Sequence, residues 1–200
     1  MGRTLGLVFG LILFCASLTV LYLCMRSVMA IGGACAEGGA YQIAVHCPKG
    51  IFPMLPLAIF AMIGGGWMYT ANSLKTAGSP QWIFFSWSAL FGSLGWNFLD
   101  FAIHPLPGMD GGDTIAWWIC GVVFMIMAAG PLLLWGSGRT GAGKIEKDEM
   151  GLWQMLFGMK PKGDEPTALK VNRYTLVLLH FAALAMGVFA GMWIFVTVST

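Results

Sequence analysis

The stretch LGLVFGLILFCASLTVLYLC, from Leu5 to Cys24, is twenty residues long and contains no charged side chain. An α-helix rises about 1.5 Å per residue, so this stretch is long enough to cross the roughly 30 Å hydrocarbon layer of a membrane. Four further stretches have a similar length and apolar character, and polar connectors separate them. The five predicted spans are 5–24, 51–71, 82–102, 114–135 and 174–198.

The composition agrees with a membrane protein. Hydrophobic residues make up 58% of the 200 residues and charged residues only 10%, whereas soluble domains carry about 25% charged residues. So few polar side chains could not cover five apolar stretches in water. The chain is therefore predicted to be an all-α integral membrane protein with one membrane domain, residues 1–200, in contact with the lipid bilayer. Its net charge of +2 does not indicate a nucleic-acid partner.

The first span has an alternative interpretation as a secretory signal peptide. Arg3 precedes the apolar run, and Val28-Met29-Ala30 resembles a cleavage site. However, the apolar core of a signal peptide is roughly 7–15 residues long, which is shorter than the run from Leu5 to Cys24. A retained membrane helix is the favoured interpretation.

The positions of the basic residues predict the orientation. With a cytoplasmic N-terminus, nine of the eleven Lys and Arg residues lie on the inner side, and only Arg26 and Lys49 lie outside. Cytoplasmic segments of membrane proteins carry an excess of Lys and Arg. We therefore expect a cytoplasmic N-terminus, an external loop at 25–50, a cytosolic connector at 136–172 and an external C-terminus.

The external loop contains Cys35 and Cys47, which this orientation places on the oxidising side. A disulfide between them would close a loop of about a dozen residues and contribute about 3 kcal/mol in the chain-entropy estimate. The alternative is a thiol-exchange pair, but such pairs are usually CxxC, and none occurs here. The other cysteines lie within spans and are predicted to pack as small apolar residues: Cys15, Cys24 and Cys120.

Two motifs carry a family resemblance. The first is the external loop from Gly32 to Gly50, with its Gly-Gly, Cys, Gly-Gly, Tyr, Ile and Cys-Pro-x-Gly pattern; the second is SLGWNFLD, from Ser93 to Asp100. Together they resemble small uncharacterised multi-pass membrane proteins of actinobacterial type. The resemblance covers part of the chain, implies a location in the bacterial plasma membrane, and implies no catalytic residue.

A stripe of polar side chains runs along the third span. Its five side chains are separated by seven, four, three and four residues, a spacing that places them on one face of a helix. An ionisable group at the centre of a membrane costs roughly 2.5–3.5 kcal/mol on insertion scales, so such a group usually faces protein or water. The stripe consists of Ser86, Ser93, Asn97, Asp100 and His104, and the last four are the candidates for binding a ligand or a proton.

Other interpretations of Asp100 remain open. It lies toward the external end of its span, where water could hydrate it, and it could pair with His104 or Arg26 to fix helix packing. A metal site would need a third ligand, for which the external side chains Asp110, Asp113 and His46 are candidates. No metal and no cofactor is predicted.

The fifth span carries small residues at four-residue steps: Ala183, Gly187 and Gly191. Such steps let two helices approach closely. His180 shares this face, so it is predicted to form a hydrogen bond across a helix contact. A haem ligand is the alternative for His180, and pairing with another chain is the alternative for the whole face.

The second span contains three consecutive glycines, Gly64 to Gly66. They indicate a close helix crossing or a hinge, and the crossing is favoured. Tyr69 and Asn72 near the inner end are predicted to be anchors at the membrane interface, where Tyr is common.

The cytosolic connector contains GRTGAGK, from Gly138 to Lys144, which matches part of a phosphate-binding loop. Ile145 stands where that motif needs Ser or Thr, so nucleotide binding is not predicted. Residues 148–159 suit a helix on the inner membrane surface, and docking onto a partner subunit is the alternative. Its apolar side chains include Leu152, Trp153, Leu156 and Phe157.

These features favour a non-catalytic plasma-membrane protein, an accessory or assembly subunit of a membrane complex with a membrane-protein partner or a second copy of itself. The alternative is a small channel, transporter or ligand-binding protein that uses the polar stripe. A membrane enzyme comes third, because the sequence shows no recognisable Ser–His, Cys–His or paired-carboxylate arrangement.

Overall fold

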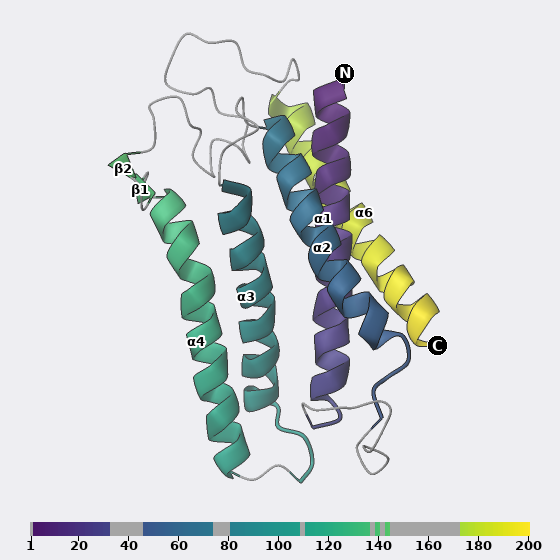
Figure 1. Cartoon of the computed structure of the whole chain (residues 1–200), viewed down its shortest axis with the longest axis vertical. Helices are drawn as coiled ribbons and strands as arrows, with labels where there is room; N and C mark the ends of the chain where they lie inside the picture. Colours follow the sequence, from purple (N-terminus) through teal and green to yellow (C-terminus); the bar gives the residue numbers. More distant parts are fainter. Residues whose placement is uncertain are drawn as a thin grey trace.

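The computed structural model describes residues 2–32, 46–73, 81–108, 111–136, 139–140, 143–144 and 173–200. Five long helices alternate in direction, so the N-terminus and the end of the last helix lie toward opposite ends of the bundle (Figure 1). The helices are α1 (Gly2–Met29), α2 (Ile51–Ser73), α3 (Gln81–Ile103), α4 (Gly111–Gly136) and α6 (Arg173–Ser199). The prediction of a helical chain is confirmed, with five long helices among the described residues.

Four of these helices are long and apolar enough to cross a membrane. They contain the candidate spans Arg3–Met29, Ile51–Asn72, Thr114–Pro131 and Tyr174–Ser199. The exception among the five helices described is α3, although its 23 residues correspond to about 34 Å of helix. Composition and not length sets α3 apart, because it carries the polar stripe and several tryptophans.

The first helix is longer than predicted. It continues beyond Cys24 to Met29, so Arg26 belongs to the helix and not to the loop predicted at 25–50. Within this last turn, the Ser27 hydroxyl donates to the Cys24 carbonyl at 2.7 Å. Gly32 follows at a φ of 101°, a left-handed conformation that glycine adopts without strain and that commonly ends helices.

Helix α1 is the centre of a three-helix group with α2 and α6. A Cβ atom added at Gly10 would lie 2.6 Å from the Tyr69 nitrogen, and one added at Gly65 would lie 2.6 Å from the Phe14 nitrogen. The backbones of α1 and α2 therefore touch at Gly10 and Gly65, where neither helix has a side chain. Gly65 lies at a helix crossing, and α2 continues through it as one helix.

The small-residue face of α6 packs against the opposite side of α1. A Cβ atom at Gly187 would lie 2.6 Å from the Cys15 Cβ, and one at Gly191 would lie 2.5 Å from the Ala16 carbonyl oxygen. Ala183 is 1% exposed. This face is therefore occupied by a helix of the same chain, which leaves it closed to a second chain in this arrangement.

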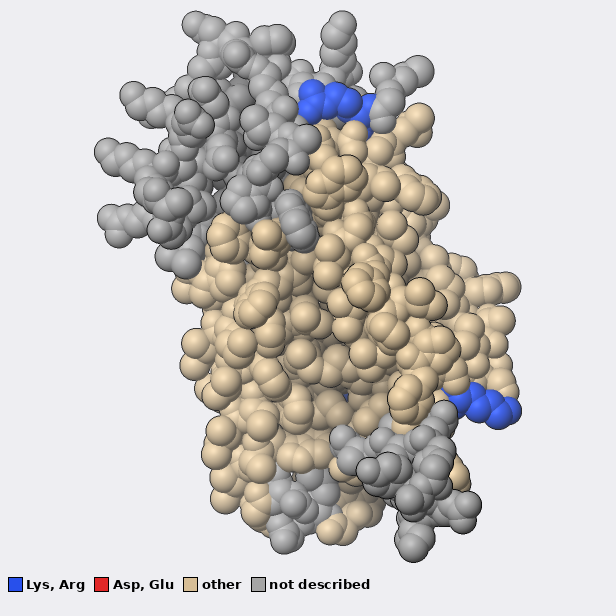
Figure 2. All heavy atoms as spheres, in the orientation of Figure 1, with Lys and Arg blue, Asp and Glu red and all other residues tan. Residues whose placement is uncertain are grey.

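Helices α3 and α4 form a separate pair, which meets the other three helices where α3 contacts α1 and α2. Only 11% of the apolar stretch of α4 is buried, compared with 56% for α1. On the face shown in Figure 2, the described Lys and Arg side chains lie toward the two ends, with a broad uncharged area between them. Large exposed apolar side chains of α4 include Ile115, Trp118, Ile119, Val122, Val123, Ile126 and Leu133.

Beyond α4, the GRTGAGK segment contributes two short antiparallel strands, β1 (Arg139–Thr140) and β2 (Gly143–Lys144), with Arg139 opposite Lys144. A phosphate-binding loop runs from a strand into a helix, whereas this segment connects two strands that pair with each other. Two predictions fall outside the described residues. They are the surface helix with Trp153 and the disulfide, whose Cys35 is not described.

Candidate functional site

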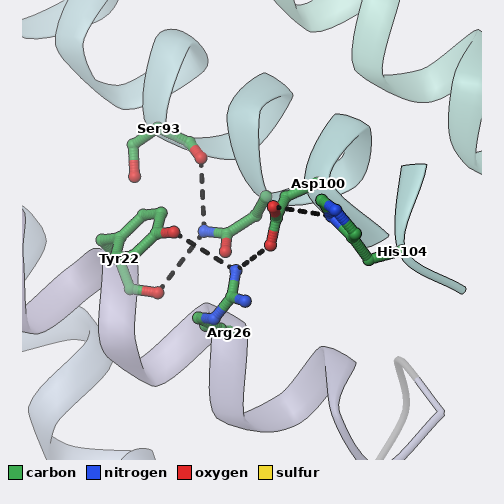
Figure 3. Close-up of polar contacts among 6 residues, drawn as sticks. Tyr22, Arg26, Ser93, Asp100 and His104 are labelled. Carbon is green, nitrogen blue, oxygen red and sulfur yellow. Dashed lines mark hydrogen bonds and ion pairs between the residues drawn. The ribbon is translucent and has the colours of Figure 1, made fainter. Parts of the chain in front are cut away.

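The C-terminal part of the polar stripe faces α1, and its Asp100 forms an ion pair with Arg26 of that helix. Arg26 Nη1 lies 2.5 Å from Asp100 Oδ2, and His104 Nδ1 lies 3.4 Å from Asp100 Oδ1 (Figure 3). Helices α1 and α3 run in the same direction, so these residues lie at the same end of the bundle (Figure 1). Asp100 thus has a cation from a neighbouring helix, and His104 is 76% exposed at its edge.

Arg26 is held by two further groups as well as by the carboxylate. Its Nη1 donates to the Tyr22 hydroxyl at 3.3 Å, one turn earlier on α1. Its guanidinium carbon lies 5.0 Å from the centre of the Phe101 ring, within the range of a cation–π interaction. Because Phe101 and Asp100 both belong to α3, Arg26 joins the C-terminal ends of the two helices.

The ion pair is only partly shielded from solvent. The side chain of Arg26 is 39% exposed and that of Asp100 is 23% exposed. Exposed ion pairs contribute about 0–1 kcal/mol, because water and salt screen them. The pair therefore stabilises the contact modestly, and its main consequence is that each charge has a counter-charge on the neighbouring helix.

One turn deeper, Asn97 is 0% exposed. Its amide nitrogen donates to the Ser93 carbonyl at 3.2 Å and to the Tyr22 carbonyl at 3.4 Å. Its Oδ1 atom and the Ser93 hydroxyl are buried without a hydrogen-bond partner among the described residues. Asn97 thus connects α3 to the backbone of α1. Its Oδ1 and the Ser93 hydroxyl can each still form a hydrogen bond with another molecule.

The first member of the stripe faces a different helix. A Cβ atom at Gly66 would lie 2.5 Å from the Ser86 hydroxyl oxygen, so Ser86 packs against α2. Ser88, which lies off the stripe, is also buried, and within the described part of the chain neither hydroxyl has a hydrogen-bond partner. The structure therefore divides the predicted face between α2 and α1.

A second polar contact lies inside the three-helix group. His180 Nδ1 is 2.8 Å from the Leu176 carbonyl, and His180 Nε2 is 2.9 Å from the Tyr69 hydroxyl. A carbonyl only accepts, so Nδ1 carries a proton; in the uncharged ring Nε2 then accepts the hydrogen bond that Tyr69 donates. Both ring nitrogens are engaged in this arrangement, which joins α6 to α2 through a neutral pair.

Tyr69 is 0% exposed, so its prediction as an interface anchor is wrong. Tyrosine is common at membrane interfaces because its hydroxyl reaches water, but here the His180 ring supplies the acceptor instead. Phe85 of α3 stacks on Tyr69 with the ring centres 5.8 Å apart. The sequence spacing contained no signal that these three side chains meet.

Metal-ligating side chains are not gathered in the part of the chain that the structure describes, where no three His, Cys, Asp or Glu residues are placed to hold an ion. Of the additional ligands considered, Asp110 lies outside the described residues. Among the described cysteines, Cys15, Cys24 and Cys120 are free thiols and Cys47 is not.

No family model, curated protein or solved structure matches this chain. Within its described residues the chain has five long helices, of which four are candidate membrane spans, and polar side chains that join α1 to α3 and α2 to α6.

Proposed function

We propose that this chain is a non-catalytic multi-pass protein of the bacterial plasma membrane that acts as an accessory or assembly subunit of a membrane complex. The observation that supports it best is the pairing of Asp100 with Arg26. The carboxylate that was the strongest candidate for moving a solute is neutralised by a neighbouring helix of the same chain. A side chain so engaged holds the bundle together.

In this proposal all five helices cross the membrane, including α3. The candidate spans α2 and α4 run in the same direction on either side of α3 (Figure 1), so α3 returns the chain between them. Its ion pair with α1 lets a helix with a carboxylate reside there. The N-terminus is cytoplasmic and the C-terminus external, since nine of the eleven basic residues then lie inside.

The external loop is closed by a disulfide between Cys35 and Cys47 in this proposal. Cys47 is 8% exposed and is not a free thiol, and the orientation places the loop on the oxidising side. Mapping of peptides without reduction tests the bond. Recovery of both cysteines as free thiols from the purified protein would contradict it.

The partner-binding part of the chain is the cytosolic segment at 148–159, with Trp153 and Phe157. The small-residue face of α6 is occupied by α1, so it does not serve as the partner surface. An apolar segment flanked by lysines suits the inner membrane surface, where it can meet another subunit.

The experiment is affinity purification of the full chain from its own membranes in mild detergent. We expect one membrane protein to copurify at constant stoichiometry, and the double variant W153A/F157A to lose it. The matched control is Trp193→Ala, which removes a 66% exposed tryptophan of α6 and should retain the partner. A chain that is partner-free in native membranes after cross-linking would contradict the proposal.

A second candidate function is a small channel, transporter or ligand-binding protein that uses the polar stripe. The unpartnered Ser93 hydroxyl and Asn97 Oδ1 favour it, because such atoms can bind a polar solute. Reconstitution into vesicles separates the two functions. Solute flux that Asp100→Asn abolishes, in a protein that still folds, would support this second function over the first.

A further inference from the structure

The hydrogen bonds of Asn97 fix which way its amide points. Both groups in contact with it, the carbonyls of Ser93 and Tyr22, only accept hydrogen bonds. The contacting atom must therefore be the amide nitrogen. Exchanging the two amide atoms would bring oxygen against oxygen, so Oδ1 has to point away from both carbonyls.

Oδ1 is consequently a buried acceptor whose hydrogen-bonding capacity is unused. It has no partner among the described residues, and the Asn97 side chain is 0% exposed. A buried polar atom without a partner costs free energy, and most such atoms in proteins are bonded to protein or to ordered water.

The Ser93 hydroxyl lies one turn before Asn97 on the same face of α3, and it is also buried without a partner among the residues described. Hydroxyls in helices usually bond back to the carbonyl four residues earlier. Thr19 does so with Cys15 at 2.8 Å, and Thr70 does so with Gly66 at 3.0 Å. Ser93 differs from both, so its hydroxyl remains available to another molecule.

We propose that Asn97 Oδ1 and the Ser93 hydroxyl bind a water molecule between α1 and α3. A buried water typically makes about three hydrogen bonds to groups that the protein leaves unpaired. Water donates to Oδ1 and either donates to or accepts from the hydroxyl, so it satisfies both atoms at once. The position lies beside α1, because the Tyr22 carbonyl accepts a hydrogen bond from the amide nitrogen of the same Asn97 side chain.

Water reaches this position from the end of the bundle at which α1 and α3 have their C-terminal ends. Arg26 and Asp100 lie one turn beyond Asn97 and are 39% and 23% exposed, and His104 beyond them is 76% exposed. The polar stripe is thus continuous from an exposed histidine to a fully buried asparagine. This proposal does not depend on the proposed function, since a subunit and a transporter could both contain the bound water.

The test is nuclear magnetic resonance of the full chain in lipid nanodiscs, with nitrogen-15 in its three asparagines. Transfer of magnetisation from water to the Asn97 side-chain amide is measured, and the signal is assigned from its loss in Asn97→Ser. We expect a direct water contact at Asn97. An observable Asn97 amide without water contact in the wild-type protein would overturn the proposal.

A pair of variants then tests the Ser93 hydroxyl. Ser93→Ala removes one of the two groups that hold the water, so the water signal at Asn97 should be lost. Thr70→Val is the control, because the Thr70 hydroxyl is already bonded to the Gly66 and Trp67 carbonyls, and the Asn97 signal should stay. An unchanged water signal in a folded Ser93→Ala protein would overturn the assignment.

Discussion

The three-helix group of α1, α2 and α6 and the contact between α1 and α3 are held together by different means. In the first, glycines bring backbones into contact, and the polar pair Tyr69–His180 is neutral and buried. In the second, the polar pair Arg26–Asp100 is charged and partly exposed. The difference teaches that burial decides the chemistry of a helix contact: the dry position has a neutral hydrogen bond, and ions are confined to the wetter end.

The largest expected effect is on the backbone contact. Gly65→Ala places a Cβ atom 2.6 Å from the Phe14 nitrogen, so α1 and α2 must separate, and overpacking of this kind costs about 1–3 kcal/mol. The measurement is reversible unfolding in mixed micelles by titration with an anionic detergent.

Gly92→Ala is the matched control in α3, since its nearest atom is the Ala128 Cβ at 3.7 Å, an ordinary contact. Alanine is favoured over glycine in a helix by roughly 0.5–1 kcal/mol, so this variant should be as stable as the wild type or more stable. Equal destabilisation by both variants would contradict the backbone contact.

The next effect in size concerns the buried neutral pair. Tyr69→Phe leaves His180 Nε2 without its donor in a buried position, which costs about 1–3 kcal/mol of unfolding free energy. Thr197→Val, at an exposed threonine of α6 whose hydroxyl bonds to the Trp193 carbonyl of the same helix, should change stability by less than about 0.5 kcal/mol. A stable Tyr69→Phe protein would mean that this hydrogen bond is not formed.

The charged pair should give a smaller effect that depends on salt. Asp100→Asn removes the counter-charge of Arg26, and the expected loss is about 1 kcal/mol, since water still reaches both groups. Raising the ionic strength from about 0.01 M to 1 M shortens the screening length from about 30 Å to 3 Å, so the loss should shrink. The Tyr69→Phe loss should not respond to salt. A salt response of equal size for both variants would remove the distinction between the two regions.

The smallest expected effect is that of His104. Its side chain is 76% exposed, and its nitrogen lies 3.4 Å from Asp100, so His104→Ala should change stability by less than about 0.5 kcal/mol. The same unfolding titration measures it. A loss as large as that of Asp100→Asn would show that His104 and not Arg26 is the principal partner of the carboxylate.

The helices were predictable from the sequence because long apolar runs have few alternatives. Five such runs lie within the five long helices of the structure. The spacing of Ala183, Gly187 and Gly191 indicated a close helix contact, and these residues lie against α1. The identity of the partner helix did not follow from the spacing, because periodicity within one helix carries no information about its neighbour.

The polar contacts were less predictable. Arg26 was assigned to a loop because the apolar run ends at Cys24, yet the helix extends through Met29. The sequence contained one signal for the Arg26–Asp100 pair. Two helices that run through a membrane in the same direction place the ends of their spans at the same depth. This relation brings Arg26 near the level of Asp100. Tyr69 offered no such signal, because its burial depends on His180, which lies 111 residues away in the sequence.

The most direct test of the account is a double-mutant cycle on Arg26→Gln and Asp100→Asn, with unfolding free energies measured in mixed micelles at low salt. If the polar stripe holds α3 against α1, the two losses will not add, and the coupling energy will be about 1 kcal/mol. Additive losses with no coupling, together with solute flux through vesicles that disappears in Asp100→Asn, would contradict it.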